Sequence, residues 1–67
     1  MTNYKNLGEN VKKFRKEQGL TQEKLAELAK VDPKSIIAIE TGKRNPSLKT
    51  LNKLSVALKI HLSNFLD

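Results

Sequence analysis

The chain has 67 residues, of which 37% are hydrophobic, and it carries 13 Lys and Arg against seven Asp and Glu, a formal net charge of +6. This length is about half that of an ordinary ~150-residue domain, so it excludes a multidomain enzyme and leaves room for one small core. The sequence contains no cysteine, which excludes disulfides and thiolate metal sites. The excess of positive charge indicates a polyanionic partner, with nucleic acid favoured over a membrane surface.

The sequence has neither a membrane-span pattern nor a signal-peptide pattern. No apolar run approaches the ~18 residues that a membrane-spanning helix needs. The first six residues, Met-Thr-Asn-Tyr-Lys-Asn, lack the apolar core of a signal peptide. We therefore expect a cytoplasmic protein without a membrane partner.

Two helices are predicted in the first half of the chain. Leu7, Val11 and Phe14 recur at helical spacing, which predicts a helix that ends at Gly19. A second helix is predicted to begin at Thr21, because a threonine hydroxyl can accept a hydrogen bond from the free N–H groups of a first helical turn. The buried stripe predicted for this helix consists of Leu25, Ala26, Leu28 and Ala29.

The second half of the chain predicts three further helices. Asp32 and Pro33 mark the start of the third, since an acidic N-cap followed by proline suits a first helical turn, and Ile36 and Ile39 continue it toward Gly42. Ser47 opens a fourth helix, and a short apolar segment ends the chain as the fifth. The apolar residues of these two helices are Leu48, Leu51, Leu54 and Leu58, followed by Leu62, Phe65 and Leu66. Because no strand pattern is present, the sequence predicts one all-α domain of five helices over residues 1–67.

The second and third predicted helices lie close together in the chain. Only the residues from Lys30 to Asp32 separate them, and so short a turn forces a sharp crossing angle. The sequence from Gln22 to Ile36 resembles the helix-turn-helix of the phage repressor and Cro family, also called the XRE family. This resemblance extends from about Leu7 to Phe65, with the motif at about 21–41, and it implies a compact lambda-repressor-like domain. Lys30 stands where this family often has glycine at a positive φ, and we expect strain of about 1 kcal/mol there.

The resemblance implies a double-stranded DNA-binding regulator of transcription, similar to small bacterial or phage repressors and to the controller proteins of restriction–modification systems. The helix that begins at Pro33 would be its recognition helix. If Ile36 and Ile39 point inward, helical geometry directs the opposite face outward to the major groove. The residues expected to contact bases are Pro33, Lys34, Ser35, Ile37 and Ala38. Because two of these are aliphatic and apolar contacts suit the thymine methyl group, we expect a half-site that contains thymine.

Other positions that match the family are expected to contact phosphates or to support the fold. The residues expected to contact phosphates are Thr21, Gln22, Thr41, Lys43, Arg44 and Asn45. Gln22 has the alternative of being an ordinary residue of a first helical turn. Family members commonly join the positions of Arg15 and Glu40 by a partly buried salt bridge, and we expect this pair to fix the recognition helix against the first helix.

Sequence-specific recognition usually needs a two-fold dimer, so we expect a homodimer on a palindromic operator. Val56 projects opposite the leucine stripe of the fourth helix, and the last leucines exceed what a small core needs. We therefore expect Val56, Leu62 and Leu66 in the dimer interface. Ile37 has an alternative role, in which it packs against the chain after Gly42 or marks a surface for protein contact.

The sequence gives no indication of catalysis. The acidic residues are scattered singly, no glycine-rich phosphate loop is present, and His61 has no neighbouring metal ligand at a suitable spacing. We expect no enzymatic activity, no metal, no cofactor and no small-molecule ligand. The alternative function is a protein-interaction module of the same fold, such as the antidote subunit of a toxin–antitoxin pair, that uses Ile37 or the last leucines. A cationic membrane-active peptide is disfavoured, because the apolar residues continue through several capped segments.

Overall fold

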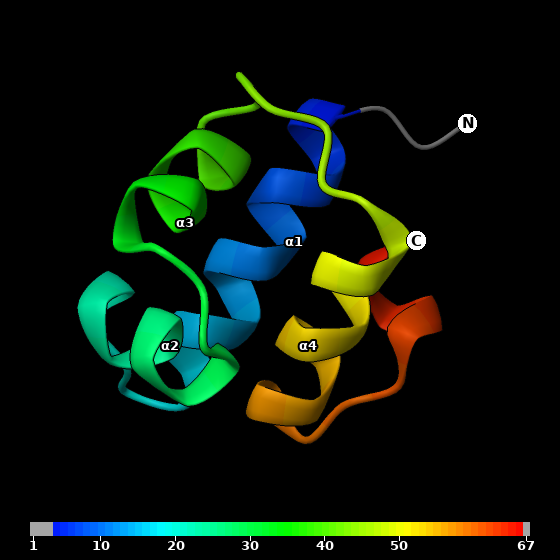
Figure 1. The fold of residues 1–67 in the computed structure, drawn as a ribbon. Helices are drawn as coiled ribbons and strands as arrows, with labels where there is room; N and C mark the ends of the chain where they lie inside the picture. Colours follow the sequence, from blue (N-terminus) through cyan, green and yellow to red (C-terminus); the bar gives the residue numbers. More distant parts are fainter. Residues whose placement is uncertain (1–3, 67) are drawn as a thin grey trace.

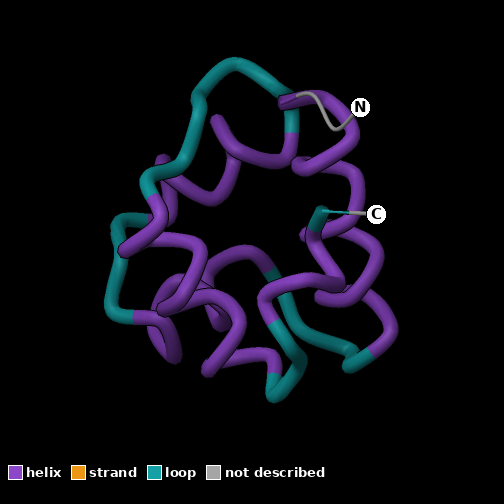
Figure 2. The backbone as a smooth tube through the Cα atoms, turned by 90° about the vertical axis from the view of Figure 1, so that its right-hand side faces the viewer, coloured by secondary structure: helices purple, strands orange, loops and turns teal. Residues whose placement is uncertain are grey.

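The computed structural model describes residues 4–66, which form four α-helices and one terminal 3₁₀ turn (Figure 1). The elements are α1 Tyr4–Glu17, α2 Gln22–Ala29, α3 Pro33–Glu40, α4 Leu48–Leu58 and η1 Leu62–Phe65. No strand is present within this range, as the tube view in Figure 2 shows. The prediction of an all-α fold is confirmed. The prediction of five helices is wrong, because residues 4–66 form four α-helices and the predicted fifth is a 3₁₀ turn.

The segment predicted as a fifth helix is held by both the side chain and the backbone carbonyl of Phe65. Lys59 adopts the left-handed conformation (φ 57°) and ends α4, after which η1 makes only one 3₁₀ turn. Phe65 is fully buried and meets Phe14 edge-to-face, with 6.2 Å between ring centroids. The Phe65 carbonyl also accepts a hydrogen bond from Asn10 Nδ2 at 2.9 Å. These contacts fix the segment without a longer helix.

The predicted starts of α2, α3 and α4 are confirmed by side-chain capping. In each case an oxygen of the N-cap residue accepts a hydrogen bond from a backbone N–H of the first turn, which would otherwise lack a partner. These bonds join Thr21 Oγ1 to Lys24 N (2.9 Å), Asp32 Oδ1 to Lys34 N (2.8 Å) and Ser47 Oγ to Thr50 N (3.1 Å). These bonds fix the residue at which each loop ends and the next helix begins.

The core lies where α1 meets α3 and α4, with α2 packed on α3 and α4 and η1 closing one side. Its buried apolar residues are Leu7, Val11, Leu25, Ala26, Ala29, Ile36, Ile39, Leu51, Leu54, Leu58 and Phe65. Of the apolar residues expected in the core, Leu28 is 47% exposed and Leu48 is 69% exposed, whereas Phe14 is partly buried against it. Leu48 is the first residue of α4 and precedes the part that faces the core, and Leu28 lies at the edge of the face that buries Leu25, Ala26 and Ala29.

A glycine inside α1 allows this helix to approach α3 closely. A Cβ atom built on Gly8 would lie 2.0 Å from the backbone oxygen of Ile39, well inside any real contact. Glycine in the middle of a helix costs roughly 1 kcal/mol relative to alanine. The close packing of α1 against the C-terminal end of α3 explains why glycine occupies this position.

Candidate nucleic-acid interface

α2 and α3 form a helix-turn-helix whose turn consists of Lys30, Val31 and Asp32. Lys30 is in the left-handed conformation (φ 59°, ψ 46°), and its N–H donates to the Glu27 carbonyl at 3.3 Å. The Val31 N–H donates to the Ala26 carbonyl at 3.0 Å and closes the turn. The positive φ expected at Lys30 is therefore present, at an expected cost of about 1 kcal/mol for a residue with a Cβ atom.

α3 buries one face and exposes the other. Ile36 is fully buried and Ile39 is 1% exposed, which orients the helix. On the outward face Lys34 and Thr41 are exposed, Ile37 is 47% exposed, and Ala38 is half-buried. Pro33 and Ser35 flank this face at the first turn, exposed and half-buried respectively. The five residues expected to contact bases thus occupy one continuous part of the surface of α3.

The loop after α3 folds back onto that helix. The N–H groups of Lys43 and Arg44 both donate to the Ala38 carbonyl, at 2.9 and 3.2 Å. The Thr41 hydroxyl donates to the Ile37 carbonyl at 2.9 Å. Lys43, Arg44 and Asn45 are exposed. The loop therefore extends the outward surface of α3 instead of projecting away from it.

A buried ion pair connects α1 to the last residue of α3. Arg15 and Glu40 are each only 7% exposed, and Arg15 Nε and Nη2 donate to the two Glu40 carboxylate oxygens at 2.7 and 3.0 Å. Arg15 Nη1 donates to the Leu20 carbonyl at 2.7 Å, and Gln22 Nε2 donates to Glu40 Oε1 at 3.1 Å. The expected salt bridge is thus present, and it joins α1, the loop before α2, the first turn of α2 and the end of α3.

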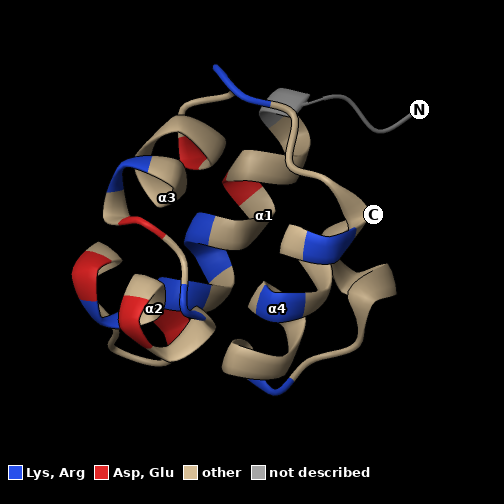
Figure 3. Cartoon of the chain, viewed as in Figure 1, with Lys and Arg blue, Asp and Glu red and all other residues tan. Residues whose placement is uncertain are grey.

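The charges are distributed unevenly over the helices (Figure 3). α2 contains Glu23 and Glu27 but only one lysine, Lys24, which lies 3.7 Å from Glu27. The loop after α3 contributes Lys43 and Arg44. Any attraction of phosphate by α2 must therefore come from the polar groups and N–H dipoles at its first turn, since the helix itself has no excess of positive charge.

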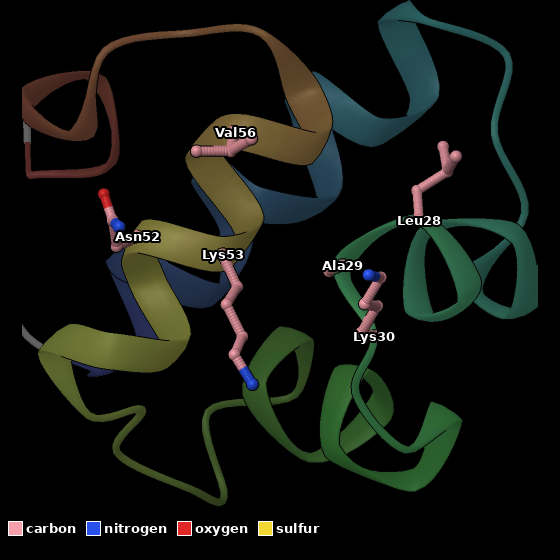
Figure 4. Close-up of a pocket in the computed structure, with 6 residues that line it drawn as sticks. All are labelled: Leu28, Ala29, Lys30, Asn52, Lys53 and Val56. Carbon is pink, nitrogen blue, oxygen red and sulfur yellow. The ribbon is translucent and has the colours of Figure 1, made fainter.

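A groove separates α2 from α4, with a volume of about 290 Å³ (Figure 4). The residues that line it are Leu28, Ala29, Lys30, Asn52, Lys53 and Val56. Of the three residues expected in a dimer interface, Val56 is 70% exposed and Leu66 is 48% exposed. The third, Leu62, is half-buried against the core. The apolar pattern of α2 gave no indication of this groove, because Leu28 was expected in the core.

The part of the chain that the structure describes contains no group of three or more His, Cys, Asp or Glu side chains that could hold a metal ion. Within the same residues, no helix is both long enough and apolar enough to span a membrane.

The chain belongs to the helix-turn-helix family, whose model matches residues 11–65. It is 42% identical over 57 residues to the immunity repressor protein of Bacillus phage phi105, covering 85% of this chain but only 40% of that repressor. It is also 46% identical over 58 residues to the control protein C.MunI from Mycoplasma sp, covering 85% of this chain and 78% of the relative.

The fold matches solved structures of the same class. The restriction-modification controller protein C.AhdI from Aeromonas hydrophila superposes with a TM-score of 0.91 at 34% identity, covering 92% of this chain and 94% of that one. The clp gene regulator ClgR from C. glutamicum gives a TM-score of 0.88 at 28% identity, covering 94% of this chain and 82% of that one. The family predicted from the sequence is thus confirmed.

Proposed function

We propose that this protein is a bacterial or phage-encoded regulator of transcription that binds specific double-stranded DNA sequences. It acts as a repressor in the cytoplasm and is associated with the nucleoid when bound. The single observation that carries this proposal is the orientation of α3. Its buried Ile36 and Ile39 turn Lys34 and Ile37 to the surface, beside a loop that contains further cations. An exposed helix of this kind, preceded by a tight turn, fits the major groove.

The proposed base contacts come from Pro33, Lys34, Ser35, Ile37 and Ala38. Lys34 can donate to guanine O6 or N7, whereas Ile37 and Ala38 offer apolar contact that suits the thymine methyl group. These contacts support a half-site that contains thymine. Readout of DNA shape would add specificity at positions that no side chain reaches.

The proposed phosphate contacts come from both sides of α3. Lys43 and Asn45 lie in the loop after this helix, Thr41 lies at its end, and Thr21 and Gln22 lie at the start of α2. Gln22 already donates one hydrogen bond to Glu40, which orients its amide and leaves a second N–H for a phosphate oxygen. These contacts would set the register on the duplex without selecting a sequence.

A homodimer is the proposed functional unit, because a palindromic operator presents two half-sites about 34 Å apart. The surface proposed for it includes Val56, Leu62 and Leu66, of which Val56 and Leu66 are exposed apolar side chains. Native mass spectrometry with and without operator DNA tests this arrangement. A dimer on DNA supports it, whereas a monomer under both conditions overturns it.

Selection of bound duplexes from a random DNA pool, followed by gel-shift titration across salt, tests the function. We expect one preferred palindromic sequence. If the dimer neutralises four phosphates, its affinity for that sequence should fall about 100-fold between 50 and 200 mM salt. Recovery of no preferred sequence would contradict the proposal.

The groove between α2 and α4 favours a second candidate function, a protein-interaction module like the antidote subunit of a toxin pair. Its apolar walls, formed by Leu28 and Val56, end at Lys30 and Lys53, and none of its lining residues is acidic. This arrangement fits an amphipathic helix with acidic residues on its polar side. A protein of this second class would shift no DNA specifically, so the same gel-shift titration separates the two candidates.

A further inference from the structure

The outward face of α3 lacks a planar hydrogen-bond donor. Its residues Lys34, Ile37 and Ala38 provide one point charge and two apolar side chains. The bidentate contacts that distinguish guanine or adenine in the major groove use Arg, Asn or Gln side chains in particular, with lysine as a less directional donor. The residues of α3 alone would therefore discriminate weakly among bases.

The loop after α3 brings a guanidinium group to this face. The Arg44 N–H donates to the Ala38 carbonyl at 3.2 Å, which places the Arg44 backbone beside the second half of α3. Arg44 Nη1 then donates to the Ser35 hydroxyl at 2.8 Å. Because Ser35 lies almost one turn before Ala38, the Arg44 side chain runs along α3 toward the N-terminal end of that helix.

The guanidinium of Arg44 is free to bind a further ligand. Within residues 4–66 the acidic partners in ion pairs are Glu40, held by Arg15, and Glu27, held by Lys24, so no carboxylate neutralises Arg44. One of its five N–H donors points to Ser35, and the side chain is exposed. The remaining donors keep the fork geometry that matches two acceptors in one plane.

We propose that Arg44 is a base-specificity residue and that it donates two hydrogen bonds to O6 and N7 of a guanine at the edge of each half-site. This inference rests on the proposed DNA-binding function. Arg44 thus belongs to the base-contacting surface and not to the phosphate-contacting residues, among which the family resemblance placed it. Ser35 then acts as a positioning residue in place of the base contact proposed for it above, because its hydroxyl accepts a hydrogen bond from Arg44 Nη1 and holds the guanidinium against the first turn of α3.

The test compares five forms of the 67-residue chain by selection from a random DNA pool: wild type, Arg44→Lys, Arg44→Ala, Ser35→Ala and Lys43→Ala. We expect the wild-type site to contain one guanine per half-site that Arg44→Lys no longer selects, with about 10- to 100-fold less discrimination at that position and the other positions unchanged. Ser35→Ala should weaken discrimination at the same guanine by a smaller factor. Lys43→Ala should lower the affinity for all DNA sequences equally.

Replacement of that guanine by 7-deazaguanine removes the N7 acceptor and sharpens the test. The wild type should lose affinity for the modified duplex, whereas Arg44→Lys should lose much less. If Arg44→Lys keeps the wild-type base preference and Arg44→Ala weakens all sequences equally, Arg44 binds phosphate and the inference is wrong while the proposed function stands. If the wild type selects no sequence at all, the proposed function fails, and this inference fails with it.

Discussion

Two arginines donate hydrogen bonds to α3, one at each end of the helix. They differ in burial and in the number of side-chain donors that are already used. Arg15 is buried, and its guanidinium donates to both oxygens of Glu40 and to the Leu20 carbonyl. Arg44 is exposed and donates to a single side chain, the Ser35 hydroxyl. The comparison separates a group whose donors are used to hold the fold from one whose donors remain available to a ligand.

The largest loss of stability is expected when the buried ion pair between Arg15 and Glu40 loses one member. Glu40→Ala leaves the Arg15 charge buried without a counter-charge, which typically costs about 3–5 kcal/mol. A 67-residue domain has a total stability of roughly 3–10 kcal/mol. We therefore expect thermal unfolding by circular dichroism to show a Tm more than about 10 °C below that of the wild type.

The matched control is Glu17→Ala, which removes an exposed acid from α1. It should change the free energy of unfolding by no more than about 0.5 kcal/mol. An equally small effect of Glu40→Ala would show that the buried pair contributes little, and the contrast between the two arginines would then fail.

A smaller loss of stability is expected from a substitution where α1 touches the C-terminal end of α3. In Gly8→Ala the new methyl group would meet the Ile39 carbonyl, so α1 must move, at a cost of about 1–3 kcal/mol that the better helix propensity of alanine only partly offsets. Urea unfolding monitored by circular dichroism measures the change. Lys12→Ala, an exposed substitution in the same helix, should leave stability nearly unchanged. A stabilised Gly8→Ala protein would contradict the close approach of the two helices.

A substitution in the turn of the helix-turn-helix should raise the free energy of unfolding modestly. Lys30 holds a left-handed conformation without the freedom of glycine, so Lys30→Gly should stabilise the protein by about 0.5–1 kcal/mol. Lys59→Gly, at the left-handed end of α4, should act in the same direction. Lys13→Gly lies within α1 and should instead destabilise by about 1 kcal/mol. Equal destabilisation by all three changes would show that neither turn is strained.

The smallest effect on stability is expected at the exposed end of α3. Arg44→Ala and Ser35→Ala each break one exposed hydrogen bond and should lower the free energy of unfolding by less than about 0.5 kcal/mol. Chemical denaturation measures this directly. A loss comparable to that of Glu40→Ala would mean that Arg44 serves the fold, which would remove the distinction between the two arginines.

Much of the fold could be predicted from local chemistry. Thr21, Asp32 and Ser47 mark helix starts because their side chains satisfy backbone N–H groups within three residues, an interaction that needs no knowledge of the rest of the chain. The positive φ of Lys30 was implied by the family resemblance, because related chains often have glycine at this position of the turn. Such short-range interactions are readable from the sequence.

The features that were missed depend on distant contacts. Gly8 faces Ile39, 31 positions further along the chain, and only the crossing of α1 over α3 explains it. A lone glycine inside a predicted helix was the available indication. The exposure of Leu28 was likewise hidden, because eight-residue α2 is too short for its apolar pattern to define one inward direction. The hydrogen bond from Arg44 to Ser35 depends on how the loop folds back, which the sequence does not specify.

The most direct test of the central proposal is a ¹⁵N-resolved NMR titration of the protein with its selected duplex and with a scrambled duplex at about 150 mM salt. We predict that the largest shift changes specific to the selected duplex fall on Lys34, Ile37, Ala38 and the loop of Lys43 and Arg44. The groove residues Leu28 and Lys53 should change little. Changes centred on the groove between α2 and α4, or identical changes with both duplexes, would contradict sequence recognition by α3.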